Sequence, residues 1–155
     1  MRQFVAKIIL FLVILFLVDT ALGICFQTLV DSAKGGETRR VNYICKQTSE
    51  DLLIFGSSRA LHHYDPLLLE DSLQMSCYNC GKDGNGIILL YGWFKMIQQR
   101  YHPQMIVYDV MPNFDLWKGD NMAYLPGLRY YYGESAVDSI FWSVDKNERF
   151  KMMVQ

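Results

Sequence analysis

The chain has 155 residues, of which 51% are hydrophobic, 14% aromatic and 20% charged. This composition supports a folded domain with a core and excludes a disordered tail. Fifteen Lys and Arg residues against sixteen Asp and Glu residues give a formal net charge of -1. Because no overall positive field exists to attract nucleic acid, nucleic-acid binding is not expected. The four cysteines are too few and too scattered for a disulfide-based scaffold.

Residues 1–30 have the character of a membrane or export segment. Arg2 and Lys7 precede an unbroken apolar run over residues 8–18, and a second apolar stretch follows Asp19. The pattern predicts an uncleaved signal anchor, a single transmembrane helix in which Lys7 and Asp19 lie near the two interfaces. The positive charge before the run places the rest of the chain on the extracytoplasmic (periplasmic) side of the membrane.

A cleaved signal peptide is the alternative interpretation of this segment. Ala21, Leu22 and Gly23 offer small residues at the spacing that a signal peptidase requires, which would leave a secreted protein. Residues 31–50 are polar, contain glycine and show no apolar period, so they are expected to form a linker. Residues 51–155 then form the folded domain.

Within the domain, short apolar runs typical of buried strands alternate with segments of helical spacing. The predicted strands are residues 51–55, 75–79 and 105–110. The predicted helices are residues 66–73 and a helix of about four turns from Ile87 up to the break at Tyr101-His102-Pro103. Asp65 and Pro66 have the residue types of a helix N-cap and first helical position. The alternating order predicts right-handed crossovers and a parallel sheet covered by helices on both faces, an α/β fold of three layers.

Ligands collect at the carboxyl ends of the strands in such sheets, and three sequence blocks fall there. They are Phe55-Gly56-Ser57-Ser58-Arg59, Tyr78-Asn79-Cys80-Gly81 and Val110-Met111-Pro112-Asn113. In this order the blocks resemble the first three blocks of the SGNH (GDSL-type) hydrolases, over roughly residues 51–115. The Gly-Ser-Ser-Arg start is similar to that of membrane-anchored bacterial relatives, and Ser57 stands where the family usually has Asp.

The resemblance implies a flavodoxin-like three-layer α/β/α domain and a serine ester hydrolase that needs no cofactor. Ser58 would be the nucleophile, exposed at a turn from strand to helix. Gly81 and Asn113 would donate hydrogen bonds to the oxyanion of the tetrahedral intermediate. The alternative for each residue is an ordinary turn: a capped turn at Ser58, a strand-end turn at Gly81 and an Asx turn at Asn113.

Several residues around these blocks are candidates for supporting roles. Ser57 and Arg59 flank the nucleophile, and Arg59 could bind an anionic group of a substrate, although an ion pair with Asp109 is the simpler expectation. Tyr130 and Tyr131 belong to a tyrosine cluster that could stack on sugar rings or pack against the domain. The cysteine pair at 77 and 80 has zinc-like spacing but no second pair, so no metal site is expected.

A general base for Ser58 is missing from the pattern. The family supplies it from a late Asp-x-x-His segment, and no Asp in this chain is followed by His at that spacing. His62 lies four residues after Ser58, but no carboxylate to orient it is evident from the spacing, so His62 and His63 are expected at the surface. His102 is expected in a loop at the opposite edge of the sheet.

The carboxyl end suggests a reason for the missing base. Residues 135–155 predict an amphipathic helix without a closing glycine or proline, and three strands make a short sheet for a doubly wound domain. The 155 residues are therefore expected to be part of a longer chain, or else a pseudoenzyme.

Two functions follow from the resemblance. The first is a membrane-anchored acyl or acetyl esterase, acting on a small ester or on cell-envelope or other glycans. The second is a catalytically inactive SGNH-like module that binds a glycan or a protein partner.

Overall fold

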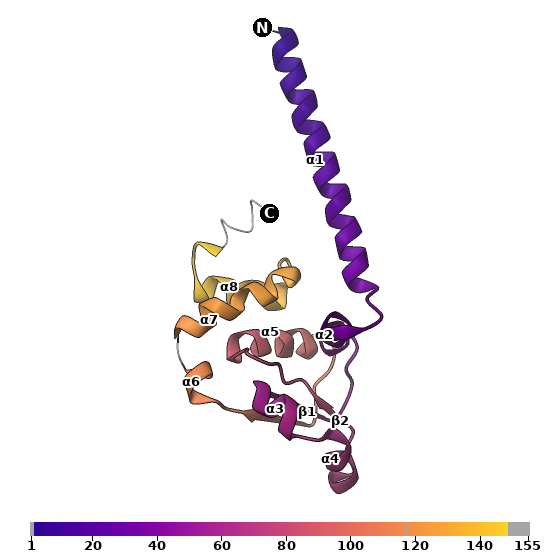
Figure 1. Ribbon diagram of the computed structural model, residues 1–155, viewed down its shortest axis with the longest axis vertical. Helices are drawn as coiled ribbons and strands as arrows, with labels where there is room; N and C mark the ends of the chain where they lie inside the picture. The colour runs from indigo at the N-terminus through magenta and orange to yellow at the C-terminus, as the bar shows by residue number, and fades with distance from the viewer. Residues whose placement is uncertain (1, 117, 149–155) are drawn as a thin grey trace. The chain divides into compact units, whose positions relative to one another are not determined.

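A computed structural model describes residues 2–116 and 118–148 of the chain (Figure 1). The chain separates into two compact units, residues 1–43 and residues 44–155, and each is described by itself.

The first unit contains the helix α1, Arg2–Asp31, which is 30 residues long and has no buried residue. It is long and apolar enough to cross a membrane, and a signal sequence near an N-terminus has the same length and composition. The hydroxyls of Thr20 and Thr28 donate to the carbonyl oxygens one turn earlier, Phe16 and Ile24, at 2.8 Å each. Polar groups satisfied within the helix suit an apolar surrounding. The expected long apolar N-terminal helix is therefore present.

Helix α2, Gly36–Lys46, occupies most of the segment expected to be a linker. The prediction of a linker over residues 31–50 is wrong for these eleven residues. Glu37 in the first turn and Lys46 in the last turn have charges that favour the two ends of the helix dipole. An apolar period is hard to see in the sequence because the buried residues of α2 are polar Asn42 and, in its last turn, Ile44 and Cys45.

The carboxyl end of α2 is held by Arg100, which lies just beyond helix α5, Ile87–Gln98. Its guanidinium donates to the carbonyl oxygens of Ile44 at 3.2 Å, Cys45 at 3.1 Å and Thr48 at 2.8 Å, and to Thr48 Oγ1 at 2.9 Å. Carbonyl groups at a helix end have no partner within the helix, so these bonds satisfy them. The partner is more than 50 residues away in the chain, which explains why local sequence gives no sign of it.

Three parallel strands form the sheet of the second unit, as expected. They are β1, Leu52–Gly56, β2, Cys77–Asn79, and β3, Met105–Asp109, in the order β2-β1-β3. In the register, Ile54 lies opposite Asn79 on one side and Val107 on the other. All residues of β1 are buried, because it is the central strand.

Helices cover both faces of the sheet (Figure 1). Leu52 and Ile54 point to one face and pack in a cluster that includes Ala60 of α3, Ser58–His63, and Leu69 of α4, Pro66–Leu73. On the other face the ring of Phe55 meets that of Phe94 of α5 edge to face, with centroids 6.1 Å apart. The described residues thus form an α/β arrangement of three layers.

The helices predicted to start at residues 66 and 87 are confirmed by α4 and α5, and the predicted cap of α4 is present. Asp65 Oδ1 accepts a hydrogen bond from the Leu67 N–H at 3.0 Å, and Pro66 is the first residue of α4. This is the arrangement expected of an Asp-Pro start, since Pro lacks an N–H that would need a partner.

Beyond the sheet the chain is helical. The elements are α6, Pro112–Asp115, α7, Lys118–Tyr124, the 3₁₀ helix η1, Leu125–Tyr131, and α8, Ser135–Val144. The helix expected over residues 135–155 ends at Val144, where the extended backbone of Asp145 stops it; residues 149–155 lie outside the described part. Val137, Ile140 and Phe141 of α8 are buried, and Val144 is partly buried.

Candidate functional site

Ser58 is the first residue of α3 and follows β1 at the carboxyl edge of the sheet. It is exposed, and its hydroxyl has no hydrogen bond with any described residue. Ser57 is buried beside it and donates to Met111 Sδ at 3.7 Å, in the loop after β3. Gly56 has φ of 151°, and a Cβ there would lie 2.6 Å from Ala60 Cβ. Only glycine allows this turn, which presents Ser58 to solvent.

Arg59 and Asp109 form a bidentate ion pair beside Ser58. Arg59 Nε donates to Asp109 Oδ2 at 2.7 Å, Nη2 donates to Oδ1, and Nη2 also donates to the Val110 carbonyl oxygen at 3.1 Å. The hydrogen bond from Arg59 holds the pKa of the Asp109 carboxyl below its usual value. Of the two roles expected for Arg59, the ion pair with Asp109 is present. The pair joins α3 to the end of β3.

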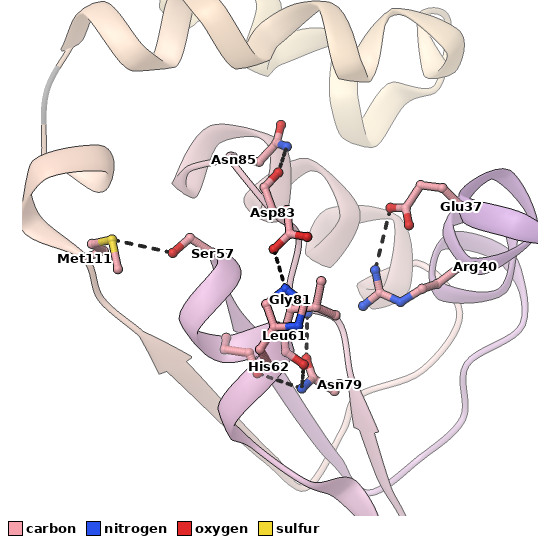
Figure 2. Close-up of polar contacts among 11 residues, drawn as sticks. Glu37, Arg40, Ser57, Leu61, His62, Asn79, Gly81, Asp83, Asn85 and Met111 are labelled. Carbon is pink, nitrogen blue, oxygen red and sulfur yellow. Dashed lines mark hydrogen bonds and ion pairs between the residues drawn. The ribbon is translucent and has the colours of Figure 1, made fainter.

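Gly81 lies in the loop after β2, where its N–H donates to Asn79 Oδ1 at 2.9 Å (Figure 2). A Cβ on residue 81 would lie 2.6 Å from the backbone nitrogen of Leu61, so only glycine fits against α3. Gly81 therefore has a packing role that the sequence did not indicate. An oxyanion could receive this N–H only if the bond to Asn79 were exchanged.

Asn79, in the block Tyr78-Asn79-Cys80-Gly81, is a structural residue that the sequence alone does not reveal. It is buried at the end of β2, and its Nδ2 group donates to the carbonyl oxygens of Ala60 at 2.8 Å and Tyr64 at 3.0 Å (Figure 2 shows the side chain against α3). These carbonyl groups belong to the last turn of α3 and the residue after it. Asn79 thereby fixes the short helix that carries Ser58.

Asn113 lies in α6, and its side chain is outside the part that the structure describes. The neighbouring Asp115 is buried and holds this loop in place. Its carboxylate accepts from the Met111 N–H at 2.7 Å and from the Tyr108 hydroxyl at 2.8 Å. Burial, together with this carboxylate, raises the pKa of Tyr108. The four-residue spacing from Met111 to Asp115, similar to a capping box, is the one sequence signal that could have revealed it.

His62 has a carboxylate partner that the sequence did not reveal. His62 Nε2 and Asp83 Oδ1 are 2.9 Å apart, and the Asp83 side chain comes from the loop after β2. Both side chains are 60% exposed, in agreement with the surface position expected for His62. His63 and His102 are exposed as well.

The two tyrosines proposed for sugar stacking differ in accessibility. Tyr131 is only 4% exposed, so it offers no face to a sugar ring, and stacking is wrong for this residue. Tyr130 is partly exposed and contacts Tyr131 edge to face, with centroids 5.1 Å apart. The Lys46 ammonium lies 5.5 Å from the Tyr130 ring centroid. Packing, the alternative considered for this cluster, accounts for Tyr131.

Within residues 2–116 and 118–148 no group of three or more His, Cys, Asp and Glu side chains could hold a metal ion. The cysteines are free thiols, and Cys77 and Cys80 are buried. Neither a family model, nor a curated protein, nor a solved structure matches the chain.

Proposed function

We propose that residues 51–155 belong to a serine ester hydrolase domain of the SGNH type, with Ser58 as the nucleophile. The observation that carries the proposal is the exposed Ser58 on a glycine-dependent turn after the central strand, between the loops that follow β2 and β3. The order β2-β1-β3 is also that of the first three strands of a flavodoxin-like sheet. Carboxyl ends of parallel strands are where such folds bind ligands.

The reaction would be acyl transfer to Ser58 from a small ester or from an acylated glycan. Asn113, in the loop after β3, would offer a side-chain amide to the developing oxyanion, and Gly81 its N–H once released by Asn79. Each such donor contributes roughly 3 kcal/mol to lowering the barrier. Arg59 is partly exposed despite its bond to Asp109, which leaves room for contact with a substrate.

A fluorophosphonate probe tests this function, because it labels a serine only when the hydroxyl is activated. The full chain in detergent micelles is treated with the probe, and labelled peptides are identified by mass spectrometry. The matched control is Ser72→Ala, which removes an exposed hydroxyl bonded only to its own helix at Leu68. We expect labelling of the native chain and of this control at Ser58, and none for Ser58→Ala. Equal labelling of Ser58→Ala would exclude Ser58 as the nucleophile.

An inactive binding module for a glycan or a protein partner is the second candidate. It is favoured by the Gly81 N–H, which is already bonded, and by the Ser58 hydroxyl, which has no partner among the described residues. A folded chain that binds acetylated glycans, hydrolyses none of them and takes up no probe would support this candidate over the esterase.

We propose further that α1 remains attached as a membrane anchor, with the domain on the extracytoplasmic side. The apolar length of α1 supports this, and secretion after cleavage near residues 21–23 is the alternative. The intact mass of the protein from bacterial membranes decides between them. The full mass supports an anchor, whereas loss of the first residues indicates a signal peptide.

A further inference from the structure

We infer that Asp19 of α1 is the contact point for another transmembrane helix, one that presents a Lys or Arg side chain near the middle of the bilayer. The inference rests on the proposed membrane anchor and adds the kind of partner that α1 binds. It starts from the position of one charged side chain within an otherwise uncharged stretch of helix.

Asp19 lies at the centre of the apolar part of α1. Residues 8–30 contain no other charged side chain, and eleven of them precede Asp19 while eleven follow it. Because α1 continues as one helix to Asp31, this stretch is roughly 35 Å long and matches a hydrocarbon core of about 30 Å. An interface at Asp19, as the sequence pattern suggested, would leave only residues 8–18, about 17 Å, to cross the membrane. The length of the helix therefore puts Asp19 near the midplane.

A carboxylate at this depth needs a partner. Asp19 has a single methylene group, so it cannot reach an interface roughly 15 Å away in the manner of a long lysine side chain. Its side chain is exposed on α1 and has no hydrogen bond or ion pair with any described residue. Ionisable side chains inside a membrane are costly and are usually paired with groups on neighbouring helices. The partner of Asp19 is accordingly expected on another transmembrane helix.

A polar face of α1 surrounds this carboxylate. Asp19, Gly23 and Gln27 are spaced four residues apart and so follow one another along one side of the helix. Gln27 is also exposed and has no partner among the described residues. A Cβ on residue 23 would meet nothing within 4 Å, so the described fold does not itself require glycine there. Glycine in a membrane helix does allow the backbone of another helix to approach closely.

The opposite side of α1 differs from this polar face. Thr28 lies nine residues after Asp19, which is half a turn away around the helix. Its hydroxyl donates to the Ile24 carbonyl oxygen at 2.8 Å and is satisfied within α1. The unsatisfied side chains of Asp19 and Gln27 thus favour contact through the polar face.

Charge decides between a second copy of the chain and a different protein. Residues 8–30 contain no Lys, Arg or His. A second copy would have the same orientation and would bring another Asp19 carboxylate to the same depth, where the low dielectric makes like charges repel strongly. A Lys or Arg side chain instead neutralises the carboxylate and donates hydrogen bonds to it. The partner is therefore a membrane protein with a basic residue near the middle of a transmembrane helix.

Synthetic transmembrane peptides of Leu and Ala test this recognition. One peptide carries Arg at its centre, a second carries Leu there, and a third carries Arg two turns away from the centre. Energy transfer from the full chain, labelled at its N-terminus, measures association in vesicles of phosphatidylethanolamine and phosphatidylglycerol. We expect binding of the central Arg peptide to be about tenfold or more tighter than that of the other two. Equal binding of all three would overturn the inference.

Two variants of the full chain show whether the preference depends on Asp19. Asp19→Leu should abolish it, because the carboxylate is removed. Thr28→Val is the matched control, since it removes a polar group that is already satisfied on the opposite side of α1, and it should keep the full preference. A preference that persists in Asp19→Leu would place the contact elsewhere.

Cross-linking in cells that make the protein natively tests the contact with its own partner. The photoreactive residue p-benzoylphenylalanine replaces Phe16, beside the polar face, or Ile14, which is at similar depth on the opposite side. We expect a cross-link from position 16 alone, to a transmembrane segment that contains Lys or Arg, and its loss in Asp19→Leu. A cross-link to a second copy of α1, or none from position 16, would contradict the inference.

The intact mass of the protein in these membranes separates the possible failures. If the mature chain lacks α1, the anchor and this inference fall together. If α1 is retained and Asp19→Leu changes neither peptide binding nor cross-linking, only this inference falls.

Discussion

Gly92 of α5 and Leu128 of η1 are packed so closely that a Cβ on residue 92 would lie 2.4 Å from Leu128 Cδ2. Leu128 is fully buried, so its side chain has little space into which to move. The contact brings the helical layer beyond the sheet against α5. An alanine at position 92 must therefore displace Leu128 or separate the two helices.

Gly92→Ala should accordingly lower the free energy of unfolding by about 1–3 kcal/mol, although alanine is the better helix former. The matched control is Gly119→Ala in α7, where a Cβ meets nothing within 4 Å. That variant should be neutral or more stable by up to about 1 kcal/mol. Urea unfolding followed by tryptophan fluorescence measures both. Equal stabilities for the two variants would mean that the α5–η1 contact is looser than described.

Asn79→Ala should destabilise the second unit by about 1–3 kcal/mol, because it leaves buried carbonyl groups at the end of α3 without a donor. Asn147→Ala is the control, since that exposed residue is bonded through its backbone N–H. Hydrogen exchange should show faster exchange in α3 for the first variant alone. Unchanged protection in α3 would contradict the role given to Asn79.

Arg100→Lys should weaken the end of α2, even though the charge is kept. A lysine ammonium cannot reach the four acceptors that the guanidinium fork bonds. We expect a loss of about 1–3 kcal/mol and faster amide exchange over residues 44–48. Arg39→Lys, at an exposed site with one bond to the Lys34 carbonyl oxygen, should have no measurable effect. The same loss in both variants would argue against Arg100 as a cap.

Cys45 should make stability depend on pH in the alkaline range. Burial raises the pKa of the Cys45 thiol from about 9.0 to about 12, against smaller opposing effects of Tyr131 and Arg100. Above pH 9 the unfolded chain loses this proton while the folded chain keeps it, so stability falls as pH rises toward 12, by at most about 1.4 kcal/mol per pH unit.

The comparison of Cys45→Ala with the native chain isolates this contribution. It is needed because Cys77, Tyr101 and Tyr108 also have a raised pKa and act in the same direction. The stability of Cys45→Ala, measured by urea unfolding from pH 8 to 11, should fall less steeply. Parallel curves would show that Cys45 titrates alike in both states.

Elements with a local signal could be predicted from the sequence. Apolar runs of strand length gave β1, β2 and β3, and the Asp65-Pro66 pair gave the start of α4, because burial and capping act through neighbouring residues. The helix predicted from residue 135 extends beyond the observed end of α8 at Val144, because the charged residues that follow carry no helix stop signal.

Features that depend on distant contacts could not be predicted in this way. The helix α2 is closed by Arg100, and the partner of His62 is Asp83, 21 residues further along the chain. The burial of Tyr131 is set by the helices around it. The tyrosine-rich sequence alone is therefore equally consistent with stacking on a sugar ring and with packing against the domain. At the site, the residue types could be predicted from the sequence, but the hydrogen bond that already occupies the Gly81 N–H could not.

The bonds from Arg100 also determine how the domain would respond to a pulling force. The chain runs from α1 through α2 directly into β1, so tension applied at the N-terminal helix reaches residues 44–48 before it reaches the sheet. There the Arg100 guanidinium donates to several carbonyl oxygens at once, so the force would pass through these hydrogen bonds to the end of α5. Tension along the chain would therefore load the bonds from Arg100 before the central strand that leads to the turn at Ser58.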